Sequence, residues 1–202
     1  KKPMKTISFL VCCFSLIFFF TDCKKNDNEN DNGSPGMLGE VGNTWNVKVN
    51  GIHDLSTQII AKEGHVVTLE VSYAKMTVKT LKFGLIGNEV VDYVYSQGNT
   101  SKPFTMVKFD AEVGDSYSTT INGIAHQREV IEKATYNVPA LNKDLEMIGV
   151  YEMVPYEIPS TFFGFTVRDI YWYWHPDYGL VCVEFYTDQG DFVKVVFVDI
   201  EV

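Results

Sequence analysis

The chain has 202 residues, of which 46% are hydrophobic and 14% aromatic, and its formal net charge is −9. This acidic balance excludes a typical nucleic-acid-binding surface and gives no electrostatic attraction to anionic lipid. With 21% charged residues, the composition also excludes a disordered chain and a multi-span membrane protein. The sequence therefore predicts one acidic, aromatic-rich globular domain with additional segments at its ends.

The N-terminus has the pattern of a secretory signal peptide over residues 1–22. A short basic region with an internal Met4 precedes residues 7–20, which are almost wholly apolar. Fourteen helical residues span about 21 Å, which is short of the ~30 Å hydrocarbon core. This length favours a cleaved signal over a permanent membrane anchor.

A cysteine, Cys23, stands where the apolar run ends, and a polar tract with Lys, Asn and acidic residues follows it. This arrangement resembles the lipobox of bacterial lipoproteins, although Asp22 stands where that family has a small residue. The resemblance implies that the signal is cut before Cys23 and that Cys23 carries the acyl chains. The polar tract resembles those of Bacteroidota lipoproteins exported to the cell surface.

Residues 23–39 are expected to form a lipidated, flexible tether, because residues 24–36 contain no large apolar side chain. The r.m.s. reach of such a tether is about 20 Å. Its acidic residues alternate like calcium-loop ligands, but Gly33 comes one place later than an EF-hand requires. A single all-β domain is expected over residues 40–202.

Only one cysteine, Cys182, belongs to the expected domain, because Cys12 and Cys13 leave with the signal and Cys23 is acylated. No intramolecular disulfide is therefore available. Cys182 lies in a strand-like run, which favours a packed core residue over a catalytic thiol.

The rest of the chain is typical of β-structure, with turn signals such as Asn50-Gly51 every eight to twelve residues. We predict a curved antiparallel sheet or half-open barrel, with a two-sheet β-sandwich as the alternative. Residues 125–135 fit a short helix and a strand equally well. The expected strands cover residues 44–49, 58–62, 65–73, 77–86, 89–95, 104–109, 116–121, 145–154, 168–174, 180–186 and 192–202.

The last three expected strands form a meander, and the final one is apolar on both faces in its middle. An antiparallel sheet open to water on one side would alternate instead. A second sheet, a helix, an apolar ligand or a partner is therefore expected to cover both faces.

One run combines an aromatic strand, a Pro turn and Gly-Leu-Val, over residues 171–181. This signature resembles Bacteroidota lipoproteins and the periplasmic DUF3108-like proteins, as do the segments 41–45 and 113–115. The resemblance implies a half-open barrel like that of lipoprotein-carrier proteins over most of residues 40–202. It implies no catalytic residues.

The aromatic strand is also the best candidate for a ligand site. Alternation places Trp172 and Trp174 on one face and Tyr171, Tyr173 and His175 on the other. Either row can stack on a sugar ring or line an apolar cavity, and either can equally be part of the sheet core.

Other chemistry has little support in the sequence. The four histidines lack zinc-site spacing, and the acidic residues Asp110, Glu112 and Asp115 fit a hairpin turn as well as calcium. No nucleophile elbow, P-loop or Rossmann glycine pattern occurs. Acidic residues in strand-like runs leave a glycosidase pair open: Glu70, Asp92, Glu152, Glu157 and Glu184.

We therefore expect an envelope lipoprotein without cofactor or metal, anchored by acyl chains on Cys23 in the outer membrane. It is expected to face the cell surface, with a periplasm-facing position as the alternative. The first functional hypothesis is a non-catalytic binding or carrier module for an apolar or glycan ligand. The second is an interaction subunit of a surface complex, and the third is a hydrolase.

Overall fold

The computed structural model describes residues 36–50, 53–156, 158, 161–162 and 165–201. This part of the chain forms thirteen strands and two 3-10 turns. The predicted signal peptide, Cys23 and most of the predicted tether lie outside it. The elements are η2 (Gly36–Gly39), β1 (Thr44–Val49), β2 (His53–Glu63), β3 (Val66–Tyr73), β4 (Met76–Ile86), β5 (Glu89–Asp92), β6 (Phe104–Lys108), β7 (Ser116–Ile121), β8 (Ile124–Val138), η3 (Pro139–Leu141), β9 (Lys143–Met153), β10 (Thr161–Phe162), β11 (Phe165–His175), β12 (Gly179–Thr187) and β13 (Phe192–Glu201).

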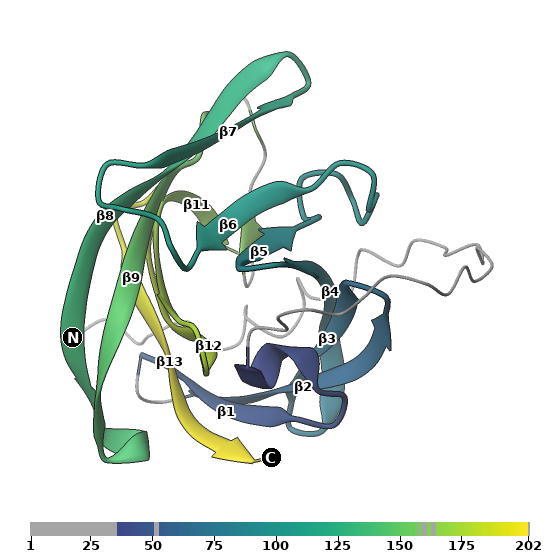
Figure 1. Ribbon diagram of the computed structural model, residues 1–202, viewed down its shortest axis with the longest axis vertical. Coiled ribbons are helices and arrows are strands. Elements are labelled where there is room, and N and C mark those ends of the chain that lie inside the picture. Colours follow the sequence, from purple (N-terminus) through teal and green to yellow (C-terminus); the bar gives the residue numbers. More distant parts are fainter. Residues whose placement is uncertain (1–35, 51–52, 157, 159–160, 163–164, 202) are drawn as a thin grey trace, which may run out of the picture.

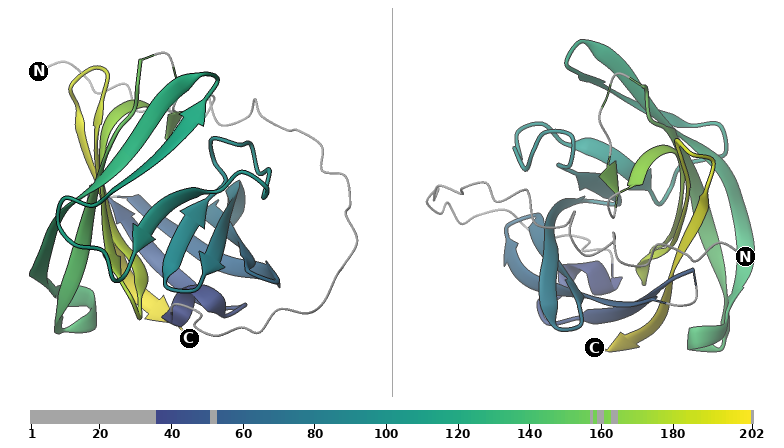
Figure 2. Two further views of the ribbon diagram at one scale, coloured as in Figure 1. Left: turned by 45° about the horizontal axis from the view of Figure 1, so that its top comes forward. Right: turned by 180° about the vertical axis from the view of Figure 1, so that it is seen from behind.

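Twelve of the strands form one antiparallel sheet in the order β6-β5-β4-β3-β2-β1-β13-β12-β11-β9-β8-β7, and β10 pairs with β11. The sheet curls until its two ends approach each other, so it forms a nearly closed barrel (Figure 1, Figure 2). The prediction of a curved antiparallel sheet is confirmed, and the two-sheet sandwich is not the arrangement found.

Residues 125–135 form part of a strand, which decides between the two structures that the sequence left open. β8 pairs with β7 on one side and with β9 on the other. Along its first half, His126, Arg128 and Val130 are buried and the residues between them are exposed. The two ladders of backbone hydrogen bonds and the inward row therefore outweigh the helix-forming composition.

The predicted C-terminal meander is also confirmed, because β12 pairs with β11 and with β13. β13 continues the sheet on its other side by pairing with β1. The predicted hairpin at Asn50 joins β1 to β2, and Asn50 adopts a left-handed φ of 51°. The N-terminal hairpins and the C-terminal meander thus belong to one sheet.

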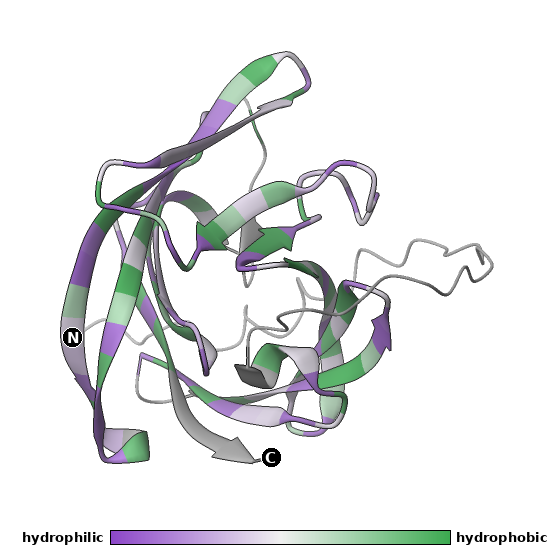
Figure 3. Cartoon of the chain, in the orientation of Figure 1, coloured by the Kyte–Doolittle hydropathy of each residue, from purple (hydrophilic) through white to green (hydrophobic). Residues whose placement is uncertain are grey.

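The core fills the inside of the barrel. Apolar and polar residues alternate along most strands, as the hydropathy colouring shows (Figure 3). The largest apolar side chains inside are Trp45, Trp174, Tyr93, Phe185, Ile59 and Met106, each less than about a fiftieth exposed.

β6 and β7 are the two edge strands, and we call the place where they meet the seam. The described residues pair no backbone groups of β6 with those of β7 as a ladder. Instead, the backbone N–H of Lys108 donates to the hydroxyl oxygen of Tyr117 on β7, at 3.2 Å. Side chains therefore join the two ends of the sheet.

Candidate functional site

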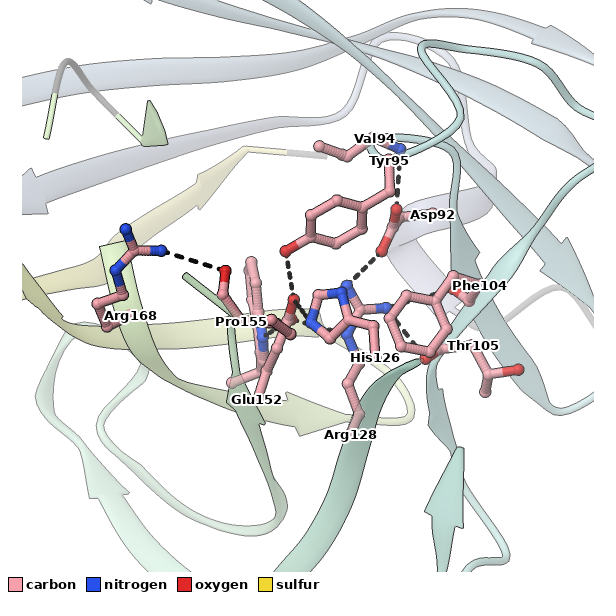
Figure 4. Close-up of polar contacts among 11 residues, drawn as sticks. Asp92, Val94, Tyr95, Phe104, Thr105, His126, Arg128, Glu152, Pro155 and Arg168 are labelled. Atoms are coloured by element: carbon pink, nitrogen blue, oxygen red, sulfur yellow. Dashed lines mark hydrogen bonds and ion pairs between the residues drawn. The ribbon is translucent and has the colours of Figure 1, made fainter. Parts of the chain in front are cut away.

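The strongest polar feature of the barrel is a buried group of side chains behind the seam, Asp92, Tyr95, His126, Arg128 and Glu152 (Figure 4). We call it the polar cluster. The guanidinium of Arg128 lies 2.6 Å from Asp92 Oδ2 and 2.7 Å from Glu152 Oε2. These residues come from β5, the segment that follows it, β8 and β9, which stand on both sides of the seam.

Arg128 also bonds to the edge strand itself. Its Nη1 donates to the backbone oxygen of Thr105 at 3.0 Å and to that of Phe104 at 3.3 Å. Its guanidinium lies 3.9 Å from the centre of the Phe104 ring. Arg128 therefore takes the place of part of the missing backbone ladder on β6.

Glu152, like Arg128, has four polar partners. Besides Arg128, it accepts hydrogen bonds from the Tyr95 hydroxyl and from Trp172 Nε1, the latter at 2.9 Å. His126 Nε2 lies 3.1 Å from its Oε1. All its lone pairs have partners, as a buried carboxylate requires.

The charges of the polar cluster respond to burial and to one another. Burial alone would raise the pKa of Glu152, but Arg128 and the hydrogen bonds from His126, Arg128 and Tyr95 lower it to about 2. Burial raises the pKa of Asp92, and Arg128 opposes that change only in part. Burial opposes the charge of Arg128, yet the two carboxylates raise its pKa. The Glu152–Arg128 pair is therefore ionised.

A hydrolase would need its carboxylates in a cleft, and Asp92 and Glu152 are not in one. Their side chains are 1% and 0% exposed. Both carboxylates bind the same Arg128 instead of flanking a substrate position. The chemistry that this arrangement can perform is ion pairing and hydrogen bonding across the seam.

The sequence contains a partial signal for the polar cluster. Asp92 and Glu152 are two of the five strand-borne acidic residues that the sequence leaves open as a glycosidase pair, and another of them, Glu157, lies outside the described residues. Alternation along residues 125–135 would have placed Arg128 and His126 on one face with Val130, but the helical alternative removed that constraint. Tyr95 follows β5 and was expected to lie within that strand.

The predicted ligand-site residues all lie on β11, on the faces expected from alternation. Trp172 and Trp174 point into the barrel and are 7% and 1% exposed. Tyr171, Tyr173 and His175 are half-buried on the outer face. Trp172 donates to Glu152, so it contributes to the polar cluster.

Tyr171 is part of an outer aromatic row, which we define as Tyr151 on β9, Tyr171 on β11, Tyr186 on β12 and Phe192 on β13. Consecutive ring centroids along this row are 5.1, 6.4 and 5.2 Å apart. Tyr186 is 42% exposed and Phe192 is 46% exposed. The row crosses four neighbouring strands without interruption.

Carboxylates flank the outer aromatic row. The Tyr151 hydroxyl donates to Asp169 at 2.6 Å. Glu184, which pairs with Tyr171 across β11 and β12, accepts a hydrogen bond from Lys194 at 2.6 Å. The surface therefore combines ring faces with fixed hydrogen-bonding groups.

The other end of the outer face is covered by the chain itself. A small apolar cluster forms there from the β8–β9 hairpin and the neighbouring strands. In it, the rings of Tyr136 and Tyr173 lie 5.6 Å apart, and the ring of His175, at its border, lies 5.1 Å from that of Tyr178. Tyr173 and His175 are therefore packed side chains, and burial lowers the pKa of His175. The apolar cluster includes Val181 of β12 and no described side chain of β13, so the expected cover over both faces of the last strand stays a prediction. The side chains of β13 beyond Val196 lie outside the description.

The barrel interior contains a cavity of about 30 Å³ near one end. We call it the mouth cavity. Its lining residues are Leu38, Trp45, Thr57, Leu69, Phe83, Val90, Trp174 and Leu180. Sites for drug-sized ligands measure about 300–1,000 Å³, so the mouth cavity as it stands does not hold a lipid.

Other candidate chemistry is confined to few residues. Cys182 is a buried free thiol, and burial raises its pKa to about 12. Within the described ranges, no three His, Cys, Asp or Glu side chains gather as they would around a metal ion. The same part of the chain has no helix with the length and apolarity needed to span a membrane.

Comparison with known proteins identifies the fold but not a family. The sequence matches no family model, and no curated protein is significantly similar to it. An inferred exported protein with a YmcC-like fold from Bacteroides fragilis aligns with TM-score 0.51 and 12% identity, over 81% of this chain and 97% of its own. An inferred lipoprotein from Parabacteroides distasonis aligns with TM-score 0.51 and 15% identity, over 85% and 100%. The hypothetical lipoprotein YmcC from Escherichia coli reaches TM-score 0.35 and 6% identity, over 83% and 89%.

The first two neighbours share the fold of this chain, and almost the whole length of each aligns with it. They support the expected barrel-like fold. They do not single out the DUF3108-like proteins to which the segments 41–45, 113–115 and 171–181 pointed. Those segments form strands and turns, which recur in many β-proteins.

Proposed function

We propose that the protein is an envelope lipoprotein, anchored through acyl chains on Cys23, that binds a glycan on the outer aromatic row. The signal-peptide and lipobox pattern of residues 1–23 supports the anchor. The inferred export or lipidation of proteins with the same fold agrees with it. We place the anchor in the outer membrane and the domain at the cell surface, with a periplasm-facing domain as the alternative.

The observation that carries the binding proposal is the outer aromatic row itself. Exposed ring faces stack on the apolar C–H faces of sugars, and neighbouring polar groups fix the orientation of the hydroxyls. Here Asp169 and the Glu184–Lys194 pair supply acceptors and a donor beside Tyr171. Of the residues predicted from sequence, Tyr171 is the one that contacts the glycan, and Trp172 and Trp174 support it from inside.

The outer surface is favoured over an interior carrier site for one reason. The mouth cavity measures about 30 Å³, so a carried ligand would require the barrel to open. A protein partner on the same face, as in a surface complex, would need an interface of about 800 Å² on each side with an apolar centre. The hydroxyls and charges along the row suit a wetter, smaller contact.

A glycan array followed by calorimetry tests the proposal. Since every described strand lies in residues 36–202 and the neighbours have this fold as nearly complete chains, that fragment is suitable for the measurement. Tyr186→Ala and Phe192→Ala should each weaken binding of the best array oligosaccharide about fivefold, since stacked rings contribute on the order of 1 kcal/mol.

Tyr73→Ala is the matched control, because Tyr73 is a comparably exposed aromatic on β3, away from the row. Its oligosaccharide affinity should equal that of the unmodified protein. A fragment that binds no glycan on the array contradicts the proposal. Self-association or a co-purified protein that is lost in Tyr186→Ala would replace the glycan with a protein partner.

The anchor needs its own test in cells. Replacing Cys23 with Ser in the full chain should abolish incorporation of labelled palmitate and release the protein from the membrane fraction. Protease treatment of intact cells then distinguishes a surface position, in which the domain is digested, from a periplasmic one.

A further inference from the structure

The mouth cavity combines two features that are independent of the outer aromatic row. Its lining is apolar except for Thr57, whose hydroxyl is already committed to the backbone oxygen of Trp45 at 3.3 Å. Two indole rings, those of Trp45 and Trp174, form part of its wall, and these residues are 2% and 1% exposed.

Both indoles carry an unused hydrogen-bond donor. Neither Trp45 Nε1 nor Trp174 Nε1 has a partner among the described residues. Buried donors are normally paired, and one left unpaired costs stability. Trp172, the third tryptophan, donates to Glu152 and does not line the cavity. Both unpaired indole donors therefore belong to residues of the cavity wall, whereas other buried donors without a partner, such as Tyr93 Oη and Arg168 Nε, belong to residues that do not line it.

One of the cavity's lining residues, Leu38, comes from the segment that precedes β1. Leu38 belongs to η2, a turn of four residues that packs against β12. The side chain of Leu38 is 7% exposed and lies directly on Gly179, where an added Cβ would overlap its Cγ and Cδ atoms. Gly179 is the first residue of β12 and has a φ of 74°. The absence of a side chain there is what lets Leu38 sit over the cavity.

We propose that the end of the barrel under Leu38 is a binding site for an apolar chain that carries an uncharged acceptor, such as an acyl ester. The ester oxygen accepts hydrogen bonds from Trp45 and Trp174, and the chain takes the volume that Leu38 fills when the site is empty. Mouths of β-barrels are common places for such sites. In the capped state the cavity of about 30 Å³ is too small for the chain, so binding requires Leu38 to leave.

Quenching of tryptophan fluorescence tests this site directly. The probe is the methyl ester of 10-bromodecanoic acid, titrated into residues 36–202, and 1-bromodecane is the matched probe without the acceptor. We call the protein uncapped when the Leu38 side chain has left the cavity. If the uncapped state makes up about one part in ten of the protein or less, removing the Leu38 side chain strengthens the apparent affinity for the ester about tenfold or more. Leu38→Ala should show this gain, and the ester should bind about fivefold more tightly than the bromoalkane.

Gly179→Ala provides a second route to the uncapped state, because the new Cβ displaces Leu38 while leaving that side chain in place. Gly190→Ala is its control: Gly190 has a similar φ of 81°, but nothing lies near its added Cβ. The first variant should gain ester affinity, and the second should not. Circular dichroism verifies that each variant is folded.

The proposal is overturned if the folded Leu38→Ala and Gly179→Ala proteins bind the ester no better than Gly190→Ala does. Equal affinities for ester and bromoalkane would remove the role of the two indoles. Tyr186→Ala should leave ester binding unchanged, and Leu38→Ala should leave oligosaccharide binding unchanged. The interior site and the glycan surface can therefore fail separately.

Discussion

Arg128 is the residue on which closure of the barrel depends most. It is 1% exposed, yet it carries a charge that two carboxylates and two backbone oxygens of β6 satisfy. A buried ion pair seldom stabilises more than apolar residues of the same volume, but it specifies which groups must meet. Here it specifies that β5, β6, β8 and β9 come together at the seam.

Removing that side chain should be costly. Arg128→Ala leaves Asp92 and Glu152 buried without their cation, so the free energy of unfolding should fall by about 3–5 kcal/mol. Lys133→Ala, on the same strand, removes an ion pair with the exposed Glu112 and should cost about 1 kcal/mol or less. Urea unfolding followed by circular dichroism measures both. Similar losses in the two variants would show that the polar cluster does not close the barrel.

Glu152 gives the barrel an acid-sensitive contribution to stability. Its folded pKa of about 2 lies below the ordinary 4.5, so the contribution is present above about pH 4.5 and is lost as pH falls toward 2. This amounts to about 3 kcal/mol. The contribution of Asp92 to stability changes with pH in the opposite direction. Burial raises its pKa, so the contribution is present at low pH and is lost as pH rises through the pKa of the folded state.

Glu152→Gln should therefore flatten the acid limb of the stability curve. The difference in unfolding free energy between the unmodified protein and this variant should shrink as pH falls from about 5 to about 2. Asp92→Asn should make the acid limb steeper, because it removes a contribution that grows as pH falls. Urea titrations at a series of pH values measure this, and parallel curves for Glu152→Gln and the unmodified protein would contradict it.

At the scale of elements, the seam is held by side chains where other strand pairs have ladders. Tyr117→Phe removes the acceptor of the Lys108 N–H on β6. The expected loss is about 0.5–1.5 kcal/mol, the net value of one hydrogen bond. Hydrogen exchange of the Lys108 amide should accelerate, whereas amides of β1, which is paired on both sides, should keep their rates relative to global unfolding. Unchanged exchange at Lys108 would mean that another group protects it.

Strand identity was largely predictable from the sequence, because alternation and turn residues are local signals. The Asn50 hairpin, the C-terminal meander and the shared face of Trp172 and Trp174 follow from such signals, whereas the inward direction of that face does not. The polar cluster was not predictable, because it depends on which strands become neighbours across the seam. The same holds for the outer aromatic row, whose four rings come from four strands and meet only through the sheet register.

For the whole molecule, charge is unevenly distributed along the barrel. Residues 44–86, which form β1 to β4, contain five Lys and three Asp or Glu, whereas residues 87–202 contain seven Lys or Arg and eighteen Asp or Glu. The outer aromatic row lies entirely on strands of the acidic part. An acidic surface repels anionic ligands and neither attracts nor repels neutral ones. If the row binds glycans, these should be neutral.

Salt dependence tests that consequence of the charge distribution. Because stacking and neutral hydrogen bonds are insensitive to screening, affinity for a neutral oligosaccharide should change less than about twofold between about 0.05 and 0.5 M NaCl. An oligosaccharide of uronic acids should bind more weakly at low salt and gain affinity as salt screens the repulsion. Calorimetry at the two salt concentrations measures both ligands. Tighter binding of the acidic oligosaccharide at low salt would contradict this prediction. It would mean that a local cation such as Lys194, and not the acidic charge of these strands, controls which glycans bind to the row.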